Sequence, residues 1–272
     1  MFYHSFHNMV SPNVIQQKIL SWYDGHKRSL PWRQTTNPYF ILISEIMLQQ
    51  TQVDRVIPKY LFFIKKYPTV QTLAKAQTAE LIKDWSGLGY NRRIIYLQKC
   101  MQVITTQYDG SVPQKYEQLL GLPGIGPYTA AAICAFAYNQ EVPSIDTNIR
   151  RVLIHELRLS WETSMNQLHA IAKECIPKGK SRDWHNALMD YGALVLTSKS
   201  TSIKPITKQT KFKGSPRWYR GKLLSYLQQD MHVTALYLRK EWQKEMAFVN
   251  QIVRSLEKDG LVKLTDKVIS LP

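Results

Sequence analysis

The sequence predicts an all-α protein with two helical lobes, followed by a small α+β domain. Apolar residues recur three and four positions apart from about Val14 to Leu196, which is the spacing of amphipathic helices. Alternation of the kind that marks β-strands is nearly absent from that part. After Leu196 a polar segment precedes a second, smaller apolar unit. These three observations define the fold class.

Helical spacing is clearest in three segments, residues 14–23, 53–64 and 168–175. Helix-breaking residues separate the segments: Pro31, Asn37-Pro38, Tyr67-Pro68, Asp109-Gly110, Pro123-Gly124, Pro143 and Pro177-Lys178-Gly179. The resulting order of elements predicts two lobes. We expect one to combine residues 1–29 with 136–196, and the other, a six-helix lobe, to comprise residues 30–135.

The end of the chain predicts a linker at 197–214 and a winged-helix-like domain at 215–272. The linker is rich in Ser, Thr and Lys and poor in apolar residues. Helical spacing returns at 218–227 and 248–256, with room for a third helix between them. Residues 261–271 then alternate as in a two-stranded hairpin. Three helices and a hairpin are typical of a winged helix.

The net charge of +16 favours a polyanionic partner, nucleic acid before an anionic membrane. No apolar run is long enough to span a bilayer, and residues 1–10 lack the build of a signal peptide. The three cysteines, Cys100, Cys134 and Cys175, lack the spacing of a metal site or a disulfide framework. We therefore expect a protein of a reducing compartment, with no membrane partner.

Residues 122–130 read Leu-Pro-Gly-Ile-Gly-Pro-Tyr-Thr-Ala and lie between a helix ending near Leu120 and an apolar helix starting near Tyr128. Gly124 and Gly126 let the backbone turn tightly. The freed N–H groups then point outward at the start of a helix, where the dipole favours an anion such as a DNA phosphate. An ordinary glycine-rich turn explains the segment equally well.

Glu45 is a lone acid among the apolar residues of a predicted helix at 41–51. Burial disfavours the charged form of a carboxyl and raises its pKa, so Glu45 is a candidate general acid near neutral pH. The alternative is a structural glutamate that pairs with an arginine, such as Arg33 or Arg151.

Asp146 follows an extended stretch that contains a proline and precedes a predicted helix at 148–155. Its type and place suit a helix N-cap. The same position suits chemistry, because the helix dipole should keep the carboxylate ionised, as the stabilisation of a positive charge requires. The two roles are compatible.

Six segments in order resemble the helix-hairpin-helix glycosylase superfamily, and within it most closely the MutY family of adenine DNA glycosylases. The resemblance covers roughly residues 15–196 and implies a two-lobed helix-hairpin-helix DNA glycosylase fold. The matching segments are Leu30-Pro31-Trp32-Arg33, Ser44 to Val53, Gly87-Leu88-Gly89-Tyr90, Leu122 to Ile133, Asp146 to Leu153 and Leu188 to Ala193.

The resemblance implies catalytic roles by position. Glu45 matches the acid that protonates N7 of a flipped adenine, and Asp146 matches the carboxylate that stabilises, or briefly bonds to, the sugar cation. Asn148 and Tyr128 match residues that orient this aspartate and line the sugar. The implied DNA- and base-binding positions are Trp32, Arg33 and Leu48 of the adenine pocket, Gln49, Gln50, Thr51, Leu88 and Tyr90 around the opposing 8-oxoguanine, and Gly124, Gly126 and Thr129 of the hairpin.

General chemistry agrees with these roles. Breaking an N-glycosidic bond builds positive charge on the sugar while electrons pass to the leaving base, so one acid and one carboxylate are needed. The base is reached only by extrusion from the stack. Where the superfamily also cuts the strand, a lysine stands at the position of Tyr128 as an amine nucleophile; tyrosine cannot form a Schiff base. We therefore expect a monofunctional enzyme.

The chain departs from the family in three places. Leu196 stands where the first of four cluster-binding cysteines would be and none follows, so we expect no iron–sulfur cluster and no other cofactor, although the hairpin is compatible with a monovalent cation. The tail is too short for the family's usual β-rich domain. The tail is basic, with 14 Lys/Arg against 6 Asp/Glu from Lys204 onward. It either binds DNA or is a module for protein–protein contact or packing. Asn91 replaces a second tyrosine.

Three functions remain open at this point. The first is excision of adenine opposite 8-oxoguanine or guanine, which Tyr90 and Gln49-Gln50 favour. The second is a thymine or uracil glycosylase acting on mispairs with guanine. The third is a non-catalytic DNA-binding protein, for which an acid such as Glu45 would have no use. The expected partner is double-stranded DNA with a mispair or an oxidised base, bound by a monomer in the cytoplasm with the DNA, in a nucleoid or a nucleus according to the source.

Overall fold

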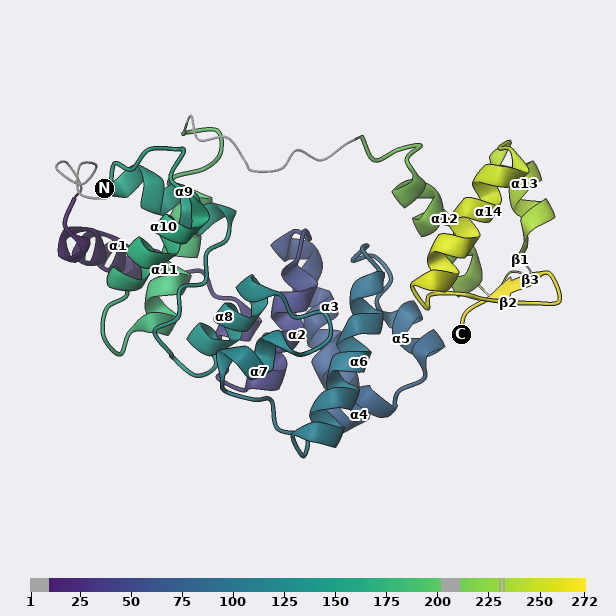
Figure 1. The fold of residues 1–272 in the computed structure, drawn as a ribbon, viewed down its shortest axis with the longest axis horizontal. Coiled ribbons are helices and arrows are strands. Elements are labelled where there is room, and N and C mark those ends of the chain that lie inside the picture. The colour runs from purple at the N-terminus through teal and green to yellow at the C-terminus, as the bar shows by residue number, and fades with distance from the viewer. Residues whose placement is uncertain (1–9, 202–210, 230, 232) are drawn as a thin grey trace. The chain divides into compact units, whose positions relative to one another are not determined.

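The structure is a computed structural model that describes residues 10–201, 211–229, 231 and 233–272 (Figure 1). The start of the chain, on which the signal-peptide prediction depends, and most of the expected linker lie outside these residues. The described part is helical up to Thr201 and carries a small sheet near the C-terminus, as the sequence predicts. None of its helices is long and apolar enough to cross a bilayer.

Helices precede the strands along the chain, apart from one very short strand. The elements are α1 (Pro12–His26), η1 (Pro31–Arg33), α2 (Pro38–Leu48), α3 (Val53–Lys66), α4 (Val70–Lys75), α5 (Thr78–Asp84), α6 (Arg92–Gln107), α7 (Tyr116–Leu120), α8 (Pro127–Phe136), α9 (Thr147–Glu156), α10 (Met165–Glu174), α11 (Ser181–Leu194), α12 (Pro216–Gln228), β1 (Val233–Thr234), α13 (Ala235–Trp242), α14 (Met246–Lys258), β2 (Lys263–Thr265) and β3 (Val268–Ser270).

The chain divides into two compact units by its internal contacts. The first unit comprises residues 1–45, 112–121 and 125–208, and the second comprises residues 46–111, 122–124 and 209–272. Each is described here by itself. The lobe boundaries expected from the sequence stay a prediction.

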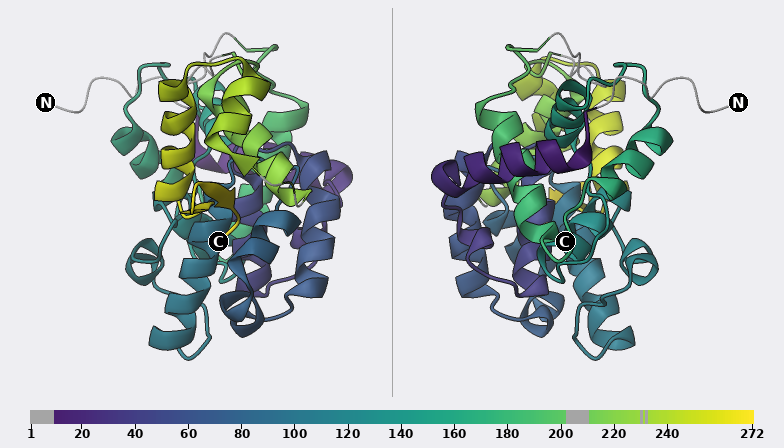
Figure 2. Two further views of the ribbon diagram at one scale, coloured as in Figure 1. Left: turned by 90° about the vertical axis from the view of Figure 1, so that its right-hand side faces the viewer. Right: turned by 90° about the vertical axis from the view of Figure 1, so that its left-hand side faces the viewer.

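The first unit is built around α11, which packs against α1, α8 and α9 (Figures 1 and 2). On α1 the buried residues are Ile15, Ile19 and Tyr23, spaced four apart as on one face of a helix. They join the fully buried Trp184 of α11 in one apolar core. Burying each such side chain contributes about 1.5 to 3 kcal/mol. Ile149, Val152 and Leu153 of α9 belong to the same core, which therefore fixes the helix that Asp146 precedes.

In the second unit α6 packs against α4 and α5. Gln98 of α6 is a buried polar residue whose amide donates to the Ala76 carbonyl at 2.7 Å and accepts from the Thr78 hydroxyl at 2.9 Å. Both hydrogen bonds fall at the connection between α4 and α5. A buried amide that is satisfied in this way ties a helix to a loop without an unpaired polar group.

The C-terminal module, residues 211–272, belongs to the second unit and contains α12, α13, α14 and a three-stranded antiparallel sheet of order β1-β3-β2. The sequence predicts only two strands. The third, β1, has two residues, Val233 and Thr234, which pair with β3; it is too short for alternation to reveal. Asp266 and Lys267 turn the hairpin with φ of 49° and 67°, which is the left-handed backbone of a tight hairpin turn.

Candidate active site

Glu45 is buried on α2, with 6% of its surface exposed. Burial and, to a smaller extent, the charge of Asp146 raise the pKa of its carboxyl, a hydrogen bond from Tyr128 and the charge of Arg33 lower it, and the result is a pKa of about 7. Burial, with the negative charges of Glu45 and Asp146, holds the pKa of the Tyr128 phenol well above its usual range, so the phenol stays a neutral donor. Glu45 can therefore carry a proton near neutral pH, as the sequence predicts.

Neither arginine that could neutralise Glu45 does so within the described part of the chain. Arg33 directs both terminal nitrogens at Asp190, with N–O distances of 2.7 and 2.8 Å. Arg151 donates instead to carbonyls and to Asn148. The alternative of a structural Glu–Arg pair is thus not supported, and the carboxyl of Glu45 remains available as an acid.

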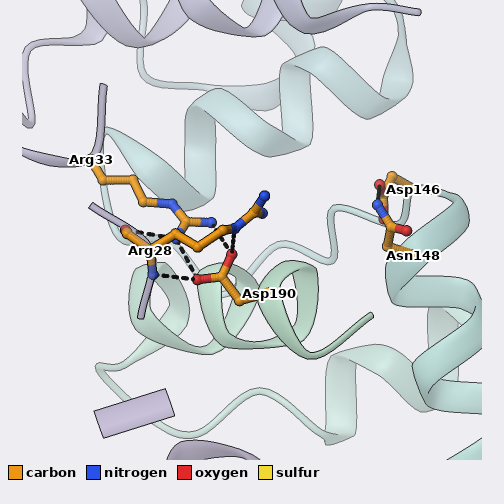
Figure 3. A network of polar contacts seen from close by, with 5 residues as sticks. All are labelled: Arg28, Arg33, Asp146, Asn148 and Asp190. Carbon is orange, nitrogen blue, oxygen red and sulfur yellow. Dashed lines mark hydrogen bonds and ion pairs between the residues drawn. The ribbon is translucent and has the colours of Figure 1, made fainter. Parts of the chain in front are cut away.

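Asp190, on α11, is fully buried and holds the segment that follows α1 (Figure 3). Its carboxylate accepts from the backbone N–H of Arg28 at 3.0 Å and from Arg28 Nε at 2.6 Å, besides Arg33. Although burial opposes ionisation, these hydrogen bonds and the arginine charges hold the pKa of Asp190 below its usual range. The ionised group therefore fixes η1, which carries Trp32 and Arg33.

Asp146 is the N-cap of α9, as the sequence predicts, and its Oδ1 accepts from the Ile149 N–H at 2.7 Å. Its Oδ2 accepts from Asn148 Nδ2 at 3.0 Å, so Asn148 orients the carboxylate (Figure 3). The electrostatics differ from the expectation. Burial raises the pKa of Asp146 above its ordinary value, because it outweighs these hydrogen bonds and the charge of Arg151. A raised pKa makes the carboxylate more reactive toward a nearby cation.

Arg151 supports Asn148 from behind. Its guanidinium donates to Asn148 Oδ1 at 2.7 Å, to the Gly192 carbonyl at 2.6 Å and to the Leu196 carbonyl. Gly192 is needed for this approach of α9 to α11, because a Cβ added there would lie 2.9 Å from the Asn148 Cβ. The series of contacts from Gly192 through Arg151 and Asn148 thus fixes the carboxylate of Asp146. Arg151 entered the sequence argument only as a partner for Glu45, so this role was missed.

An iron–sulfur cluster, which the family resemblance implies, does not fit the residues present. The chain has three cysteines, each buried on or at the end of a different helix, and burial raises the thiol pKa of Cys100 to about 12 and those of Cys134 and Cys175 to about 11. Leu196, at the position of the first ligand, is buried in the apolar core. No four-thiolate set can form in this chain, and the lack of a cluster stays a prediction.

Five residues match family positions around the opposing base and are called the wedge group after the role that the resemblance implies. They lie on two loops of the second unit, the wedge loops, at 49–51 and 87–90: Gln49, Gln50, Thr51, Leu88 and Tyr90. Gln50 and Tyr90 have φ of 56° and 46°, a left-handed backbone conformation that residues other than glycine rarely adopt. Both are exposed, Tyr90 to 38%. Leu88 is buried at 3%, so as a DNA contact it stays a prediction that its burial does not favour.

Arg93, at the start of α6, joins the two wedge loops. Its side chain also lies over the rings of Trp85 and Tyr90, 5.3 and 5.7 Å from their centroids. Burial lowers the pKa of Arg93 to about 10, which leaves it charged at neutral pH. The guanidinium donates to the carbonyls of Ile46, Met47, Gln49, Leu88 and Gly89 and to Thr51 Oγ1, at 2.7 to 3.3 Å. Sequence reasoning missed this residue, although it lies only three positions after Tyr90 of the Gly87–Tyr90 motif.

The glycine-rich segment turns as predicted. Gly124 has φ of 78°, and a Cβ there would lie 2.7 Å from the Tyr96 Cβ, so only glycine fits. Gly126 is the N-cap of α8, whose first turn contains Pro127. Thr129 is 2% exposed, and its burial does not favour a side-chain contact with DNA. Trp32 is also buried, and Leu48 is half-buried.

A protonatable carboxyl, a second carboxyl at a helix N-cap and a glycine hairpin on a helical fold define a base-excision DNA glycosylase. Residues 43–178 match the family of HhH-GPD superfamily base excision DNA repair proteins. The chain belongs to this superfamily.

Relatives include enzymes with different named substrates. The chain is similar to the adenine DNA glycosylase of Mycolicibacterium smegmatis, 37% identical with 91% of this chain and 92% of the relative covered. It is 34% identical to the thymine/uracil-DNA glycosylase of Methanothermobacter thermautotrophicus, with 67% of this chain and 84% of the relative covered. The solved structure of a thermostable thymine-DNA glycosylase superposes with a TM-score of 0.65 at 32% identity, covering 69% and 88%. The superfamily is thereby shown, and the substrate base is not.

Proposed function

We propose that this DNA glycosylase removes adenine paired with 8-oxoguanine or guanine, by hydrolysis of the N-glycosidic bond. The observation that carries the proposal is the carboxyl of Glu45, buried without an ion-pair partner among the described residues and with a pKa of about 7. A purine leaves most easily when a ring nitrogen is protonated, and an acid with a pKa near the working pH is the best donor. The similarity to adenine DNA glycosylases over most of the chain supports the same base.

In the proposed reaction Glu45 gives its proton to N7 of the extruded adenine. The electrons of the C1′–N9 bond pass into the base, and the sugar becomes a cation that Asp146 stabilises. Water then adds to C1′, and the proton that it releases restores the acid. Asn148, held by Arg151, keeps the Asp146 carboxylate oriented during these steps.

The wedge group serves extrusion of the base. Gln50 and Tyr90 would enter the stack where the flipped base leaves it, an event that costs a few kcal/mol. Both residues have a left-handed backbone in the protein without DNA, and a loop that keeps its conformation on binding loses less conformational freedom.

Thymine or uracil excision is the second candidate, favoured by the similarity to thymine glycosylases. The two candidates separate in one experiment. The protein is incubated with duplexes that hold A opposite 8-oxoguanine, A opposite G, T opposite G and U opposite G, and the products are cleaved with alkali. Strand breaks in the first two duplexes support the proposal. Breaks only in the pyrimidine duplexes would contradict it.

We further propose that the enzyme is monofunctional, because Tyr128 offers a phenol where an amine would be required for a Schiff base. Borohydride trapping on substrate and on abasic DNA tests this. Capture at the background level of a mock reaction is expected, and efficient covalent capture would overturn the assignment.

A further inference from the structure

The C-terminal module contacts the second wedge loop at three places. Before the loop, the Ser86 hydroxyl donates to Gln228 Oε1 at 2.9 Å. In the loop, Arg217 Nη1 donates to the Tyr90 phenol oxygen at 3.1 Å. After it, Arg92 Nε lies 3.4 Å from the carboxylate of Asp259. Helix α12 carries Arg217 and Gln228, and Asp259 caps α14, so two elements of the module flank this loop.

The module also contacts the rest of the second unit through residues other than Arg217. Gln228 Nε2 also donates to the Ile82 carbonyl at 3.2 Å. Within the module, Arg220 donates to Asp259 and to Ser255, both at 2.6 Å, which holds Asp259 in place for Arg92. Removal of the Arg217 guanidinium should therefore leave the module folded and docked.

The ring of Tyr90 is held at two points by cations. Arg93 lies over its face at 5.7 Å, and Arg217 donates to its hydroxyl oxygen. The contact with Arg93 orients the plane of the Tyr90 ring, and the contact with Arg217 fixes the position of its hydroxyl. A hydrogen bond from a charged donor to a neutral acceptor is among the stronger ones, and it polarises the phenol O–H toward a further acceptor. A side chain fixed in this way loses less conformational freedom when it enters the base stack.

We propose that Arg217 is a positioning residue for the Tyr90 wedge, through which the C-terminal module takes part in discriminating the base opposite the excised one. The inference rests on the proposed function for the identity of the wedge. It assigns the module a role beyond general affinity for DNA. The role is exercised through Tyr90 and not by direct contact of Arg217 with the reacting atoms.

The test compares Arg217→Met with wild type on two duplexes, A opposite 8-oxoguanine and A opposite G, under single-turnover conditions. The rate of adenine release opposite 8-oxoguanine, divided by the rate opposite G, should fall about tenfold, the equivalent of one charged hydrogen bond. Arg239→Met is the matched control, because it removes the same charge from an exposed position of α13. The control should keep the wild-type ratio. Equal thermal unfolding of the three proteins checks that the module stays folded.

A double-mutant cycle with Tyr90→Phe isolates the contact. The phenylalanine lacks the acceptor oxygen, so adding Arg217→Met to it should change the ratio no further. A wild-type ratio in Arg217→Met, or an equal fall in Arg239→Met, would overturn the inference.

A binding assay separates this inference from the proposed function. Affinities are measured for duplexes with a tetrahydrofuran abasic analogue opposite 8-oxoguanine or opposite G, which need no adenine chemistry. If wild type releases no adenine, the proposed function fails, and the affinity ratio still decides the role of Arg217. Loss of that ratio in Arg217→Met alone supports the inference, and an unchanged ratio contradicts it.

Discussion

The acid site of the first unit and the wedge group of the second are held by different physical means. Side chains hold the acid site: Asn148 orients Asp146, and Tyr128 donates to Glu45. The guanidinium of Arg93 holds the wedge loops mostly through backbone carbonyls, and Thr51 Oγ1 also donates to the Leu88 carbonyl at 3.3 Å. The acid site is therefore specified by which side chains are present, and the wedge by the path of the backbone. Changes in the two regions should have different signatures.

The largest effect is expected from Glu45→Gln. Loss of the general acid should lower the adenine release rate by about 10³-fold, while the affinity for substrate DNA stays near wild type. Single-turnover alkaline cleavage and fluorescence anisotropy measure the two quantities. The exposed Glu162→Gln serves as control and should be fully active. If Glu45→Gln still releases adenine, the acid has been misassigned.

Asp190→Asn should reduce stability most. The change leaves Arg28 and Arg33 without their buried carboxylate, at about 3 to 5 kcal/mol. Denaturant unfolding measures the loss. Asp183→Asn, on the exposed side of the same helix, should change stability little. Equal stability of the two variants would show that the ion pairs do not hold η1.

Arg93→Lys tests how the wedge loops are held. One ammonium cannot reach acceptors on both wedge loops, so several carbonyls lose their donor and stability should fall by about 2 to 3 kcal/mol. Discrimination between 8-oxoguanine and guanine opposite adenine should fall as well, because Tyr90 loses the planar guanidinium that lies over its ring. Arg254→Lys, an exposed change in the same unit, is the control. If Arg93→Lys is less stable but still discriminates between 8-oxoguanine and guanine as wild type does, Arg93 supports the loops without orienting Tyr90.

The raised pKa of Glu45 also predicts a pH dependence of stability. The pKa of Glu45 is raised from 4.5 to about 7 in the folded state, so the folded protein binds more protons than the unfolded chain between these values. Its contribution is present below pH 4.5 and is lost as the pH rises through 7, by about 3 kcal/mol. Glu45→Gln should therefore gain stability relative to wild type at pH 8 and gain little at pH 4. A constant difference at both pH values would contradict the raised pKa.

The same titration should appear in catalysis. Adenine release should decline as the pH rises through about 7, because Glu45 loses the proton that it donates. The pH profile of the single-turnover rate measures this. A profile flat from pH 6 to 8 would point to another donor.

Local patterns were enough to predict much of the fold. The helices, the N-cap role of Asp146 and the turn at Gly124 follow from spacing and from residue type. The burial of Glu45 was also predictable, because its neighbours in sequence are apolar. The choice between a general acid and a structural partner of Arg33 or Arg151 was not. The family resemblance supplied the order of the motifs and the candidate roles.

The supporting contacts could not be predicted in the same way. Arg93, Asp190 and Arg217 act through partners that lie up to 162 residues away in sequence, as Arg28 and Asp190 show. Which partner a long side chain reaches depends on tertiary packing and leaves no local pattern. The raised pKa of Asp146 is likewise a tertiary effect, since burial overrides the local contribution of the helix N-terminus.

Gly192 gives the acid site a mechanical property. The distance between α9 and α11 is set by the absence of a single methyl group, since a Cβ at this position would come within 3.0 Å of the Asn148 backbone oxygen. Asp146 stands at the first turn of α9, so any widening between these helices would displace the carboxylate together with its helix. The position of the Asp146 carboxylate thus depends on the spacing of two helices, which the missing side chain of Gly192 permits.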